Sequence, residues 1–200
     1  MTDSIKTNTQ KSNTDTNNEK IKLEEVIKKL DSVGQELIPV PKPLTQEITA
    51  KIELIVKELT TLEKEILSKK EYVTEQVNII NKKIDNLIKT KKIKLNAKER
   101  EQSEKNIQHY IKLLDGVAKE IKQEMSYFSQ FLSDKPPTQI VAPKVAQNNF
   151  GTYLQEKVRW ANRYAKNIKK NIAISFSRYK FSFEEQLKKL DYMQNYLKSE

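Results

Sequence analysis

The residues best suited to binding chemistry lie toward the C-terminal end of the chain, where three of the four arginines and the only tryptophan fall within twenty residues. The candidate set comprises Arg159, Trp160, Arg163, Tyr164, Lys166, Lys170 and Arg178. The cations from Arg159 to Lys170 follow steps of four, three and four residues, so on a helix they form one stripe. Cations beside flat aromatic rings suit phosphate contact with stacking on bases, or a position among lipid headgroups.

Three interpretations of this stripe stay open. It can be a solvated face, with Trp160 and Tyr164 buried against a neighbouring helix or subunit. It can bind the nucleic-acid backbone, or it can contact an anionic membrane or an acidic protein surface. Arg159 lies about 160° around a helix from Ala161, a member of the apolar face, so we expect the cations to point outward.

A second basic patch is expected in residues 80–95, which hold six Lys and one Asp. Its members are Lys89, Lys91, Lys92 and Lys94. Lysine outnumbers arginine 33 to four across the chain, a skew typical of AT-rich coding, and a lysine-rich turn is ordinarily solvated. Because that bias raises lysine alone, the stretch with arginine and tryptophan is the more specific signal.

The chain lacks the residues that familiar catalytic sites require. The chain has no Cys and one His, His109, with no Glu three positions before it. No glycine-rich phosphate loop, dinucleotide-binding motif, zinc-protease motif or nucleophile elbow occurs. We therefore expect no enzyme activity, no catalytic residue, no metal and no cofactor.

The composition favours an all-α fold, because three Gly in 200 residues are too few for the turns of a β or α/β protein. Residues 1–18 are almost entirely polar and are expected to form a disordered tail. Residues 19–34 repeat apolar side chains at helical spacing and predict a short amphipathic helix. The proline-rich segment 35–44 predicts a stiff extended linker.

Residues 45–133 predict an antiparallel coiled-coil hairpin. From Thr45 to Lys91 there is neither Gly nor Pro, and apolar residues recur in steps of three and four. Through Lys69 the steps are three, four and four residues, which together make an eleven-residue stretch. Such an interruption of the heptad pattern is a stutter, and it locally unwinds the supercoil. After a polar turn, Asn96 and Glu99 have the spacing of a capping box. The next helix then follows the heptad Ile107, Ile111, Leu114, Ala118, Ile121, Met125, Phe128 and Leu132.

A linker is expected at 134–149, and residues 150–198 predict a long basic amphipathic helix that packs on the hairpin. Its apolar face runs from Leu154 to Leu197 in steps that are often four, four and three. Residues 172–183 also alternate like two strands, but only Ser177 and Arg178 are available to turn between them. We favour the helix. The fold expected is thus an elongated antiparallel hairpin completed by a third long helix into a three-helix bundle.

These features favour a non-enzymatic structural or assembly protein that self-associates or docks into a larger complex of cytoskeletal, chromosome-associated or virion type. The basic face of the last helix would meet an anionic partner. The alternative is a sequence-nonspecific nucleic-acid-binding protein that uses residues 157–180. The partner is expected to be a second copy or another helical protein, with DNA or RNA backbone as an alternative and a peripheral anionic membrane less favoured. With neither a signal segment nor a membrane-spanning run in the sequence, we expect a cytoplasmic location.

Overall fold

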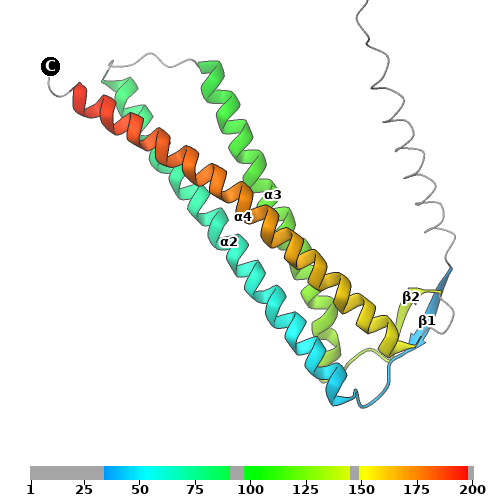
Figure 1. Cartoon of the computed structure of the whole chain (residues 1–200). Helices are drawn as coiled ribbons and strands as arrows, with labels where there is room; N and C mark the ends of the chain where they lie inside the picture. The colour runs from blue at the N-terminus through cyan, green and yellow to red at the C-terminus, as the bar shows by residue number, and fades with distance from the viewer. Residues whose placement is uncertain (1–33, 91–96, 145–148, 198–200) are drawn as a thin grey trace, which may run out of the picture. The chain divides into compact units, whose positions relative to one another are not determined.

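The computed structural model describes residues 34–90, 97–144 and 149–197 (Figure 1). Its elements are β1 (Gln35–Pro39), α2 (Gln46–Lys89), α3 (Ala97–Ser129), a 3-10 turn η1 (Gln130–Leu132), β2 (Gln139–Pro143) and α4 (Phe150–Tyr196). The three long helices confirm the all-α class. The expected tail at 1–18 and nearly all of the helix expected at 19–34 lie outside the described residues, as do Lys91, Lys92 and Lys94.

Local chemistry accounts for the bounds of α2. The hydroxyl of Thr45 caps its start by accepting a hydrogen bond from the backbone N–H of Ile48, 3.3 Å away. Glu47 places a negative charge in the first turn and Lys89 a positive charge in the last, as the helix dipole favours. Without Gly or Pro in its interior, the helix continues for 44 residues, a length of about 66 Å.

The described residues divide into two compact units, the first formed by 34–42 with 138–144 and 149–153, and the second by 43–90, 97–137 and 154–197. The second unit contains α2, α3 and nearly all of α4. Ion pairs between Lys70 and Asp115 and between Asp85 and Arg100 show that α2 and α3 are antiparallel. The expected hairpin is therefore confirmed.

The last helix packs along both helices of the hairpin, antiparallel to α3 and parallel to α2 (Figure 1). Its contacts follow in order along each neighbour, so the expected three-helix bundle is also confirmed. They join Glu124 to Lys157 and Tyr110 to Ser175 on the α3 side, and Glu65 to Lys169, Tyr72 to Phe176 and Lys83 to Asp191 on the α2 side.

The inner face of α3 departs from the strict heptad at both ends. Near its start the most buried side chain is Tyr110 rather than Ile107 or Ile111, because a straight helix drifts about 20° from a seven-residue repeat with every heptad. At its end Phe131 is buried and Leu132 is exposed. There the 3-10 turn places side chains three residues apart in the same direction, so Phe131 follows Phe128 inward.

The structure confirms the helical interpretation of residues 172–183. On a strand Ile172 and Ile174 would share a face, as would Phe181 and Phe183. In the structure Ile172 and Phe183 are buried, whereas Ile174 and Phe181 are exposed. A rotation of 100° per residue in α4 separates each pair.

The two expected linkers need a correction, because five residues of each form a strand. β1 and β2 pair antiparallel with Leu37 opposite Val141. Val40 N–H donates to the Thr138 carbonyl at 2.9 Å and Lys144 N–H to the Gly34 carbonyl at 2.6 Å.

This register explains why the strands tolerate proline. The bonds made by residues 34 and 40 fix the even-numbered positions of β1 as the hydrogen-bonded ones. Pro39 and Pro143 therefore lie where a backbone N–H would point away from the partner strand, and their missing N–H breaks no ladder bond.

The neighbouring phenylalanines of α4 give a matched test of this packing. Phe183 is 1% exposed and Phe181 is 67% exposed. We expect Phe183→Ala to lower the free energy of unfolding by about 3–5 kcal/mol, because it leaves a cavity in the core. Phe181→Ala should change it by less than about 0.5 kcal/mol. Denaturant titration followed by circular dichroism measures both values, and equal losses would contradict a helix at this position.

Candidate binding face on the last helix

The structure places the predicted site residues of α4 on or beside one surface. Arg159, Arg163, Lys166, Lys170 and Arg178 are exposed. Trp160 is 50% exposed and Tyr164 is half-buried. In the secondary patch, Lys89 is exposed at the end of α2.

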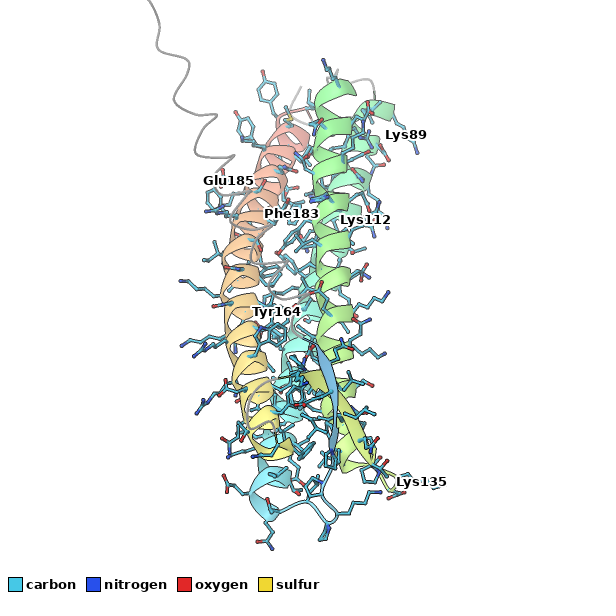
Figure 2. The ribbon with its side chains drawn as sticks, turned by 90° about the vertical axis from the view of Figure 1, so that its right-hand side faces the viewer. Lys89, Lys112, Lys135, Tyr164, Phe183 and Glu185 are labelled. Carbon is cyan, nitrogen blue, oxygen red and sulfur yellow. The ribbon has the colours of Figure 1, made fainter. Side chains whose placement is uncertain are left out.

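An aromatic cluster fixes the orientation of Trp160. Its ring stacks on that of Tyr164, with centroids 5.2 Å apart and planes 7° from parallel. The hydroxyl of Tyr164 donates a hydrogen bond to the carboxylate of Glu120 on α3. The ammonium of Lys157 lies 5.2 Å from the Trp160 centroid and 3.5 Å from a carboxylate oxygen of Glu124. Tyr164 thus turns toward the bundle (Figure 2). Trp160 remains partly exposed at the surface.

Acidic neighbours balance only part of the positive charge. Arg159 pairs with Glu156 at 2.6 Å, and Lys169 lies 3.8 Å from Glu65 of α2. Four other cations make no ion pair with any residue in 34–90, 97–144 or 149–197. They are Arg163, Lys166, Lys170 and Arg178. Their charge is therefore available to an anionic partner.

Apolar side chains that the sequence analysis left out of the site lie among these cations. Ile174 is 45% exposed and Tyr192 is 73% exposed. At 100° per residue, Arg163, Ile174, Phe181 and Tyr192 lie within about 20° of one another around the helix. We use the name α4 outer face for Trp160, Arg163, Lys170, Ile174, Arg178, Phe181 and Tyr192, which together span an arc of about 80°.

The other side of α4 explains why this face points outward. Ala161, Ile172 and Phe183 are buried in the bundle, and Tyr179 stacks on Tyr110 with ring centroids 4.2 Å apart. Figure 2 shows Phe183 and Tyr164 on the side of α4 that faces the other helices. The outer face is therefore held in place by the apolar packing behind it.

A groove of about 560 Å³ is lined by residues of α4 and α2 beside the outer face. Leu62 and Ala165 line it, with Lys166 and Lys169 at its α4 wall. Lys166 thus lies between the groove and the α4 outer face, where it adds positive charge to both.

Two tyrosines in the bundle hold their protons strongly. The pKa of Tyr164 is raised, first by burial and then by its hydrogen bond to Glu120 and the charges of Glu120 and Glu124. Burial likewise raises the pKa of Tyr110, and its hydrogen bond with Ser175, 3.1 Å between hydroxyl oxygens, partly opposes that shift. Both rings are therefore neutral hydrogen-bonding groups at physiological pH.

Neither a metal cluster nor a membrane span is found among the described residues. His109 is exposed on α3, and no three His, Asp or Glu side chains within the described ranges gather where they could hold a metal ion. No helix in those ranges is long and apolar enough to cross a membrane.

No family model matches the chain, and searches of curated proteins and of solved structures find no match.

The raised tyrosine pKa values predict a loss of stability in alkali. Because the folded pKa of Tyr164 exceeds its ordinary value of 10.0, its contribution is complete below pH 10.0 and disappears as the pH rises through the folded value. We expect Tyr164→Phe to make the unfolding free energy less sensitive to pH above 10.0. Absorbance titration should show native tyrosines that ionise later than the same residues in denaturant. Identical tyrosine titration curves in the folded protein and in denaturant would contradict the raised pKa values of Tyr110 and Tyr164.

Proposed function

We propose that this chain is a non-enzymatic structural or assembly protein, a helical bundle that self-associates or docks into a larger complex through α4. A cytoskeletal, chromosome-associated or virion component would each use such a bundle. The observation that carries the proposal is the α4 outer face, which combines exposed Ile174, Phe181 and Tyr192 with cations that pair with no acid among the described residues.

The energetics of exposed apolar groups support docking. A single exposed leucine is ordinary, but Ile174, Phe181 and Tyr192 follow one line on a helix whose opposite side already fills the core. Full burial of an exposed phenylalanine side chain such as that of Phe181 is favourable by about 1.5–3 kcal/mol, and Ile174, which is 45% exposed, would contribute less. An interface that covered this line would therefore gain stability that the isolated bundle lacks.

The charges of the same face support an anionic partner. Arg163, Lys170 and Arg178 have no acidic partner among the described residues, so an approaching anion displaces no internal ion pair. This arrangement also favours a second candidate, the binding of nucleic-acid backbone without sequence preference. Phosphates would contact these cations and release their counterions.

Mass measurement tests the assembly proposal. We expect light scattering of the purified chain to show a dimer or a larger species whose proportion rises with concentration. Any part of this self-association that uses the α4 outer face should shift toward the monomer in Phe181→Ser without loss of helical circular dichroism, because this side chain is exposed within the bundle. A wild-type monomer over a wide concentration range would contradict self-association.

Charge reversal tests the nucleic-acid candidate. With about four phosphate contacts, the affinity for duplex DNA should fall about 100-fold between 50 and 200 mM salt. Arg163→Glu with Lys170→Glu should abolish this binding. Lys119→Glu with Lys122→Glu is the matched control, since it changes the net charge equally at exposed positions of α3. Absence of wild-type binding at low salt would eliminate the candidate.

A further inference from the structure

We propose that the anionic partner of the α4 outer face is a membrane surface that contains acidic lipids, along which α4 lies without crossing the bilayer. This inference rests on the proposed function only in taking the α4 outer face as the docking surface. It identifies the chemistry of the partner from the order of side chains along that face.

Cations and apolar groups are interspersed along the whole face. From Trp160 to Tyr192 it extends about 48 Å along the helix. Arg163 and Lys170 precede Ile174, and Arg178 separates Ile174 from Phe181. A lipid surface offers phosphates and an apolar layer side by side over such a distance, so both kinds of side chain find partners at once. Tryptophan and tyrosine also prefer the headgroup region, where one edge is apolar and the other is wet.

A single partner helix fits this face less well. A coiled-coil seam needs apolar residues at nearly every core position. Positions seven residues apart from Trp160 onward are Asn167, Ile174, Phe181 and Lys188, so polar side chains interrupt the line. A second copy packed in register would also bring Arg163, Lys170 and Arg178 close to their own counterparts. Like charges would then oppose the pairing.

Duplex nucleic acid also leaves much of the face unused. The major groove is about 12 Å wide, so a straight helix meets phosphates over only part of a 48 Å length. Ile174 and Phe181 gain nothing from phosphate, and their exposed area would stay in water. Trp160 is poorly placed for stacking on a base, because Tyr164 stacks on its ring and the Lys157 ammonium lies 5.2 Å from its centroid.

The single tryptophan gives the inference a local readout. Trp160 belongs to the α4 outer face and is the only indole in the chain, so all tryptophan emission reports this surface. Contact with the headgroup and acyl boundary should shift the emission to shorter wavelength. Brominated acyl chains should quench this emission more than unbrominated ones do, and neither nucleic acid nor a protein partner can produce that dependence on bromination.

The experiment measures binding of the full chain to two kinds of vesicle. One kind is made of phosphatidylcholine alone, and the other of phosphatidylcholine mixed with phosphatidylserine. We expect cosedimentation and a blue shift of Trp160 only when phosphatidylserine is present, with both reduced by salt. Arg163→Glu with Lys170→Glu should lower the partition coefficient at least about 100-fold. The control pair Lys119→Glu with Lys122→Glu should retain most of the binding.

A second variant separates the apolar contribution from the charge. Ile174→Ser with Phe181→Ser should weaken vesicle binding by about 10-fold or more while its dependence on salt persists. Both side chains are exposed, so helical circular dichroism should stay unchanged. Equal vesicle binding by this variant and the wild type would overturn the proposal that apolar side chains enter the lipid.

The remaining outcomes distinguish the inference from the proposed function. Self-association without binding to either vesicle would overturn the lipid partner and leave the assembly proposal standing. Binding to duplex DNA but not to vesicles would overturn the lipid partner and identify nucleic acid as the partner of the α4 outer face. Equal binding to vesicles with and without phosphatidylserine would overturn the requirement for acidic lipid. A monomer that binds none of these ligands would overturn both the inference and the proposed function.

Discussion

The second unit depends on one constraint, the burial of a single side of α4 against both helices of the hairpin. Ala161, Ile172 and Phe183 are buried there, and the stacked rings of Tyr110 and Tyr179 extend the packing toward α3. Since α4 rotates by 100° per residue over 47 residues, fixing this side determines what every other side chain faces. The outward direction of Arg163, Ile174 and Phe181 is thus a consequence of the core.

The sequence was sufficient to predict the three long helices and the inner face of α2. All eleven apolar positions that repeat from Ile48 to Leu87 are buried or half-buried in the structure, because a period of three and four residues translates directly into one side of a helix. The strand pair was not predictable in this way. Leu37 and Val141 are separated by about a hundred residues, and no local pattern encodes a register across that distance.

The candidate site was predictable in part for similar physical reasons. Spacing alone placed Arg163, Lys166 and Lys170 on an exposed stripe. Spacing could not show that Lys157 meets Glu124 or that Tyr164 meets Glu120, since those carboxylates come from another helix. The intervals of seven and eleven residues that link Ile174, Phe181 and Tyr192 were present in the sequence. Their meaning became clear only once the opposite side of α4 was seen to be filled.

The division of α4 into a buried side and an outer face can be tested directly, because the sequence contains no cysteine. Single cysteines placed at each position from 172 to 183 can be reacted with a soluble thiol reagent in the folded protein. We expect fast labelling at 174, 178 and 181 and slow labelling at 172 and 183, with a period of about 3.6 residues. Labelling that alternates with a period of two, or that is uniform across the stretch, would contradict this division.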